Sequence, residues 1–97
     1  MGHKLSQQDS ELYRRVDEVL HYIWDPIGIS DSPYARDEYH SYLPRVFSLL
    51  KSSAEIKVIS DFLIEVEHEQ MGLRSSEKRA KRVAEILLEY KKKILEG

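Results

Sequence analysis

The stretch HYIWDPIGISDSPYARDEYHSYLP, residues 21–44, separates the helical patterns on its two sides and decides how the chain folds. It contains the only tryptophan, all three prolines and four acidic residues. The residue before a proline avoids the α conformation, so Asp25 must leave the preceding helix, and Gly28 allows a further bend. We interpret Trp24, Pro26 and Gly28 as a corner between helices, with the tryptophan covering the end of the core.

A long helix is predicted before this corner. Its apolar residues recur three and four positions apart from Leu12 to Ile23, which is the spacing of one buried helical face. Ser6 followed by Asp9 is a weaker form of the capping box that starts helices. We therefore expect a first helix from about residue 7 to the corner.

A second helix is predicted after the corner. Ser32 is a suitable N-cap, and Pro33 fits the first helical position because its missing amide hydrogen would be unpaired there anyway. Helical spacing continues from Tyr39 to Leu50 across Pro44. Since Pro44 removes one backbone hydrogen bond, we expect the helix to be split into two pieces at this residue.

Two further helices are predicted in the remainder of the chain. Ser52 and Glu55 form a capping box for a third helix, and Gly72 suits the left-handed residue that ends it. Ser75 or Ser76 caps a fourth helix. The apolar positions recur at helical spacing and are Ile56, Ile59, Phe62, Leu63 and Val66 in the third helix and Ala80, Val83, Leu87, Tyr90 and Ile94 in the fourth.

Length and composition favour a single all-α domain over residues 1–97. The 97 residues, 41% of them apolar, suffice for one modest core, so the expected fold is a compact bundle of four to five short helices. The sequence has no cysteine and no apolar run typical of a signal peptide or of the roughly 20 residues that span a bilayer. We expect a cytoplasmic protein without membrane contact.

The charges are distributed unevenly along the chain. Residues 1–40 carry eight acids and four bases, and residues 41–73 carry five acids and three bases. The last 24 residues carry eight bases and four acids, although the net charge of the whole chain is −2. This pattern indicates an acidic body followed by a basic last helix.

Two Glu-x-x-His pairs resemble part of the ligand set of di-iron helical bundles. They are Glu18 with His21 and Glu65 with His68. Such ligands must project into the bundle, whereas a helical wheel places these side chains about 120° to 180° from the centres of their apolar stripes. We therefore predict solvated polar faces, no metal site and no cofactor.

The residue spacings of nucleophilic catalysis, phosphate-binding loops and calcium loops do not occur in the sequence. The acids Asp25, Asp31, Asp37 and Glu38 could supply acid–base catalysis or bind a hard cation. A structural role is favoured, with Asp25 forming a turn and the last two acids lying in the first turns of a helix. Because so small a core can hardly enclose a pocket, we predict no catalytic residues and no enzyme.

The basic last helix raises a second class of function. Its bases Arg74, Lys78, Lys81 and Arg82 cluster opposite the apolar face, after a glycine-containing turn that resembles a helix-turn-helix junction. Surfaces that bind nucleic acids usually carry many more bases than acids, and four glutamates are interspersed here. A solvated face is therefore favoured, and no direct nucleic-acid binding is predicted.

The motifs of the corner resemble a family of small bacterial helical proteins. The segments that carry the resemblance are IWDPIG (residues 23–28), ARDEYHSYLP (residues 35–44) and EHEQMGL (residues 67–73). The resemblance covers residues 12 to about 73, and members of the family resemble the immunity proteins of polymorphic and contact-dependent growth inhibition toxin systems. His40 departs from the family pattern, which has an acid there, and the basic last helix lies outside the resemblance.

The resemblance implies a cytoplasmic inhibitor that binds the C-terminal domain of a cognate toxin, an RNA-cleaving nuclease, and covers its active or substrate-binding surface. A nuclease attracts phosphates with a basic face, which an acidic protein would find quickly. The candidate partner-binding residues are Asp31, Tyr34, Asp37 and Glu38. We also expect a monomer when the protein is free. The alternatives are a helical adaptor or regulator without a toxin, and a nucleic-acid-binding module that uses the last helix.

Overall fold

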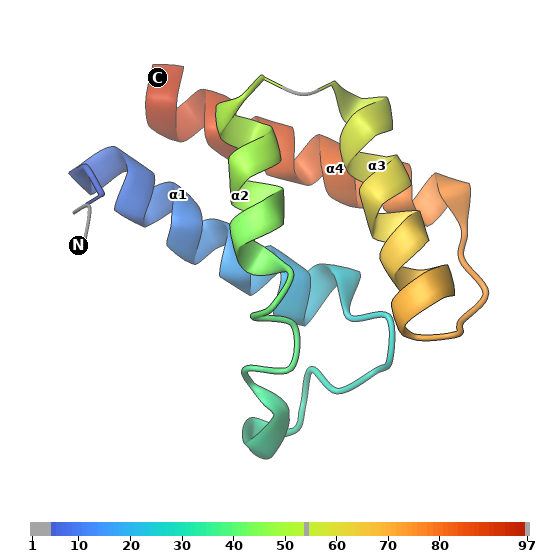
Figure 1. The fold of residues 1–97 in the computed structure, drawn as a ribbon. Helices are drawn as coiled ribbons and strands as arrows, with labels where there is room; N and C mark the ends of the chain where they lie inside the picture. Colours follow the sequence, from blue (N-terminus) through green and yellow to red (C-terminus); the bar gives the residue numbers. More distant parts are fainter. Residues whose placement is uncertain (1–4, 54, 97) are drawn as a thin grey trace.

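The computed structural model describes residues 5–53 and 55–96, in which four α-helices surround a shared core (Figure 1). The helices are α1 (Gln7–Glu18), α2 (Leu43–Lys51), α3 (Ile56–Glu65) and α4 (Glu77–Lys91). Wider π-helical turns extend three of them, at Val19–Trp24, Val66–Gln70 and Lys92–Glu96, and a short 3-10 turn spans Pro33–Ala35. These described ranges contain no strand, so the expected all-α bundle is confirmed.

The helices pack around α4. The main contact of α3 is with α4, and α1 lies against both α2 and α4; in Figure 1, α4 passes behind α2 and α3. Their buried apolar side chains form one cluster, and the radius of gyration of 13.1 Å is close to the roughly 12.5 Å of a compact chain of this length. Within the two described ranges, every helix is too short or too polar to cross a membrane.

Several helix ends follow the local sequence signals. Ser6 and Ser76 each accept a hydrogen bond from the amide three residues later, at 3.0 and 3.2 Å, so both predicted N-caps are confirmed. Gly72 has a φ of 64°, and the amide of Leu73 donates back to the carbonyl of Glu67 at 2.7 Å. This glycine therefore ends the third helical segment in the left-handed conformation that only glycine adopts without strain.

The helix predicted after the corner is wrong for residues 36–42. These residues form successive turns, and α2 begins only at Leu43. The chain does break at Pro44, which lies in the first turn of α2, where its missing amide hydrogen costs nothing. Asp37 and Glu38 consequently lie in turns and not at a helix start, because side chains of this segment are held by α1 and the corner, as described below.

The capping box predicted at residues 52–55 is also wrong. Ser52 instead ends α2, where its hydroxyl donates to the carbonyl of Leu49 at 3.0 Å. The next residue, Ser53, has a left-handed backbone with a φ of 64°, so the chain turns away before α3 begins. Glu55 is extended and makes no side-chain cap bond. The serine hydroxyl therefore closes one helix and does not open the next.

Trp24 joins the corner to the rest of the core. Its side chain is fully buried, and its ring centroid lies 5.3 Å from that of Tyr39 and 6.1 Å from that of Tyr42. The indole N–H donates to the carboxylate of Glu67 at 2.7 Å. Because a buried indole needs such an acceptor, this bond fixes the corner against the π turn that follows α3.

Replacing Trp24 with alanine should lower the free energy of unfolding by about 3 to 5 kcal/mol, because it empties the core at the corner and leaves the Glu67 carboxylate without its donor. Urea denaturation followed by circular dichroism measures the loss. Tyr34→Ala, at an exposed side chain, is the control and should change stability by less than about 0.5 kcal/mol. A loss below about 1 kcal/mol for Trp24→Ala would show that the corner does not depend on the indole.

Candidate functional site

The four predicted partner-binding residues lie on one loop. Residues 25–42, which we call the acidic loop, run out from the helical body between the π turn that follows α1 and the start of α2 (Figure 1). Tyr34 lies in the 3-10 turn of this loop with 97% of its surface exposed. Asp31, Asp37 and Glu38 are exposed on either side of it in the sequence. The structure therefore leaves all four side chains accessible on a single segment.

The carboxylate of Asp25 organises the first part of the acidic loop. It accepts hydrogen bonds from the amides of Ile29 at 2.8 Å and Ser30 at 3.0 Å, and from the hydroxyl of Tyr39 at 2.8 Å. The same hydroxyl accepts a hydrogen bond from the amide of Ile27 at 3.2 Å. The two ends of the loop are thus joined by Asp25 and Tyr39, which confirms the prediction that this aspartate forms the turn.

These bonds determine the protonation of the two side chains. Burial raises the pKa of the Asp25 carboxyl, but the hydrogen bonds from Ile29, Tyr39 and Ser30 outweigh it, so the pKa lies below its usual value of 3.8. Burial, together with the hydrogen bond to Asp25, raises the pKa of the Tyr39 hydroxyl. At neutral pH the carboxylate is therefore ionised and the phenol keeps the proton that it donates.

His21 lies under the acidic loop, contrary to the outward direction that the helical wheel predicts. Its side chain is buried, and Nε2 lies 3.2 Å from the carbonyl oxygen of Ser30, which can only accept a hydrogen bond. The π turn Val19–Trp24 changes the residue spacing on which the wheel depends, and the loop covers this face. The histidine therefore anchors the loop from below.

The two Glu-x-x-His pairs do not converge. Glu18 pairs with Arg15 at 2.9 Å, and Glu65 and His68 are exposed. Over residues 5–53 and 55–96, His, Asp and Glu side chains form no group of three or more that could hold a metal ion.

A second anchor attaches the acidic loop to α1. Arg36 donates two hydrogen bonds to the carboxylate of Asp17, both at 3.0 Å, and its guanidinium carbon lies 5.3 Å from the centroid of the Tyr22 ring. His40 Nε2 lies 3.0 Å from the same carboxylate. Sequence reasoning missed this anchor, because no local spacing connects residues that are 19 and 23 positions apart. The histidine also suits this place better than an acid, which Asp17 would repel.

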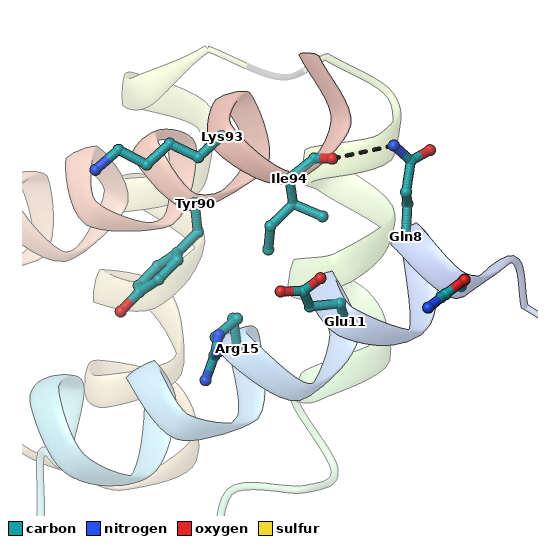
Figure 2. Close-up of a pocket in the computed structure, with 7 residues that line it drawn as sticks. Gln8, Glu11, Arg15, Tyr90, Lys93 and Ile94 are labelled. Carbon is teal, nitrogen blue, oxygen red and sulfur yellow. Dashed lines mark hydrogen bonds between the residues drawn. The ribbon is translucent and has the colours of Figure 1, made fainter. Parts of the chain in front are cut away.

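An open groove of about 480 Å³ lies between the start of α1 and the last turns of the chain (Figure 2). Its described lining residues are Gln7, Gln8, Glu11, Arg15, Tyr90, Lys93 and Ile94. Arg15 is engaged by Glu18, and the side-chain amide of Gln8 donates to the carbonyl of Ile94 at 3.3 Å. No histidine, cysteine or serine is among these lining residues.

The basic side chains predicted at the last helix divide into two groups. Arg74, Lys78, Lys81 and Arg82 are exposed. Arg79 is exposed as well, but its guanidinium donates to the backbone carbonyl of Trp24 and ties the first turn of α4 to the corner.

Comparisons of the chain with protein-family models, with curated proteins and with solved structures found no match. The resemblance of the corner motifs to immunity proteins therefore stays a prediction. The motifs themselves have a structural explanation. Trp24 donates to Glu67, Tyr39 donates to Asp25, and the rings of Trp24 and Tyr39 pack against each other. A function has to be inferred from the exposed surface of the site and not from the fold.

Asp25→Asn should lower the free energy of unfolding by about 1 to 3 kcal/mol at pH 7, because the amide cannot accept all three hydrogen bonds. Asparagine tolerates the left-handed backbone of this residue, whose φ is 31°. Since the pKa of Asp25 is lowered on folding, its stabilisation is present above pH 3.8 and is lost as the pH falls through the folded-state value. The difference in the free energy of unfolding between the original protein and Asp25→Asn should therefore become smaller in acid.

Urea denaturation of both proteins from pH 7 to the lowest pH at which they fold measures this difference. Other carboxyl groups titrate in both proteins, so their contribution cancels. Asp31→Asn, at an exposed carboxylate, is the matched control and should stay within about 0.5 kcal/mol of the original protein. A difference for Asp25→Asn that does not change with pH would contradict the assignment.

Proposed function

We propose that this protein is an immunity protein that binds a cognate toxin nuclease domain through the acidic loop and covers its active or substrate-binding surface. The observation that carries the proposal is the exposed Tyr34 in the 3-10 turn of a loop whose backbone is held in place. Tyrosines that are exposed in the free protein and buried in a complex supply much of the binding free energy of protein interfaces.

The anchors of the acidic loop favour binding. Asp25 and Tyr39 join the two ends of the loop, His21 contacts it at Ser30, and Asp17 holds Arg36 in its middle. A loop that is already ordered loses less conformational entropy when a partner binds. The backbone that carries the exposed side chains is therefore held in place before a partner binds.

The charges of the loop indicate the chemistry of the partner. Asp31, Asp37 and Glu38 form no ion pair with any residue in the described part of the chain. Their negative charge is therefore available to a basic surface, which it would attract over a distance of about 10 Å at moderate ionic strength. A nuclease needs a basic surface to hold its phosphate-rich substrate, and an acidic loop on that surface would exclude the substrate.

Reversing the charge of the loop tests this mechanism. Asp37→Lys with Glu38→Lys should weaken binding to an inactivated form of the toxin domain that we expect a neighbouring gene to encode, by more than about tenfold. Most of the loss of affinity should appear as a lower association rate. Added salt should make the difference in association rate between the variant and the original protein smaller. Because both acids lie in turns, the melting temperature should change little.

The matched control reverses two charges at the other end of the molecule. Lys92→Glu with Lys93→Glu changes two exposed residues near the C-terminus, far from the acidic loop in Figure 1, and should leave association unchanged. Stopped-flow kinetics at two ionic strengths and survival of cells that produce the active toxin are the measurements. Unaltered association and full protection by the loop variant would refute the proposed mechanism, and absence of binding by the original protein would refute the function.

A further inference from the structure

The corner exposes apolar side chains beside the acidic loop. Tyr22, Ile23 and Ile27, which we call the apolar ridge, are 57%, 42% and 41% exposed. Six large apolar residues are exposed in the described ranges, and four of them, the three ridge residues and Tyr34, fall within residues 22–34. Single exposed apolar residues are normal on protein surfaces, whereas a group of them often marks an interaction site.

The apolar ridge is not needed to close the core. Leu20 and Trp24 of the π turn belong to the core, His21 is covered by the acidic loop, and Tyr22 and Ile23 are exposed. The interior side chains already form a continuous cluster with the four helices. The exposed apolar surface of the ridge therefore contributes little to folding and is free to be buried by a partner.

The apolar ridge is connected to the acidic loop at two of its residues. The ring of Tyr22 lies against the guanidinium of Arg36, which belongs to the loop. Ile27 is itself a residue of the loop, and its amide donates to the hydroxyl of Tyr39 near the loop's other end. A partner that engages the exposed acids therefore meets the ridge in a fixed position.

The exposed side chain of Tyr34 alone is too small to form a stable interface. A standard complex buries about 800 Å² on each partner, which is about one-eighth of the 6460 Å² surface of this protein. The exposed Tyr34 can supply only about 150 to 250 Å². The remaining area has to come from neighbouring surface, and the apolar ridge is the apolar part of that surface.

We propose that the partner-binding surface extends from the acidic loop onto the apolar ridge, and that its occupant is a folded basic protein domain with an apolar patch beside its basic residues. This inference rests on the proposed function and deepens it. Charged groups at the edge of an interface mainly set the association rate, whereas buried apolar contacts mainly set the dissociation rate. The acidic loop therefore attracts the toxin domain, and the ridge retains it. A nucleic acid would be repelled by the loop acids and would gain little from the ridge.

The test replaces Ile23 and Ile27 together with serine, which removes apolar surface without changing charge. Dissociation from the inactivated neighbouring toxin domain should become at least about tenfold faster, with association within about twofold of the original rate. Val58→Ser is the matched control, because Val58 is 48% exposed on α3, whose first turn lies far from the acidic loop in Figure 1. This control should dissociate at the original rate.

The outcomes distinguish the proposed role of the apolar ridge from the proposed function. If the original protein binds and the serine variant dissociates at the same rate, the apolar ridge is not part of the interface, although the proposed function survives. If the original protein does not bind, both proposals fail. Should the double variant not fold, amide hydrogen exchange of the original protein decides: protection of residues 22–27 by the bound toxin domain supports the ridge, and unchanged exchange overturns it.

Discussion

The indole of Trp24 and the groups that surround it hold three parts of the chain together. The indole N–H donates to Glu67 beyond α3, and the backbone carbonyl of Trp24 accepts from Arg79 in α4. A buried indole without an acceptor and a buried carboxylate without a donor would each be unfavourable. The corner, the end of α3 and the start of α4 are therefore fixed to one another at a single residue.

The position of Trp24 determines the form of the acidic loop. Asp25 follows it directly, leaves the helix with a φ of 31°, and accepts hydrogen bonds from both ends of the loop. Because Tyr39 packs against the indole and also donates to Asp25, the loop is attached to the core and not only to itself. The same arrangement leaves the apolar ridge and Tyr34 exposed. Residues 21–44 therefore contain both the side chains that hold the corner together and the side chains that a partner can reach.

Local patterns in the sequence predict the features that local interactions determine. The N-caps at Ser6 and Ser76, the left-handed Gly72 and the turn at Asp25 each depend on residues within a few positions, and the structure confirms them.

The features that depend on distant residues could not be predicted. The partner of Trp24 is 43 residues away, and no periodicity identifies it. The burial of His21 could not be predicted because the acidic loop covers it through Ser30, nine residues along the chain, and because a wheel of 100° per residue does not hold in a π turn. Residues 36–42 keep the pattern of a helix, but their bonds to Asp17 and Asp25 favour turns. The exposure of Asp31, Tyr34, Asp37 and Glu38 agrees with the prediction, while their role in binding stays a prediction.

Native-state amide hydrogen exchange tests the central claim that the corner holds the acidic loop in one conformation. The amides of Ile29 and Ser30 both donate to Asp25, so in the free protein they should be protected to a similar degree as that of Leu63, a buried residue of α3. Comparable protection would show that the loop opens only when the core opens. Exchange of both amides at the rate of an unstructured peptide, with Leu63 still protected, would contradict the account.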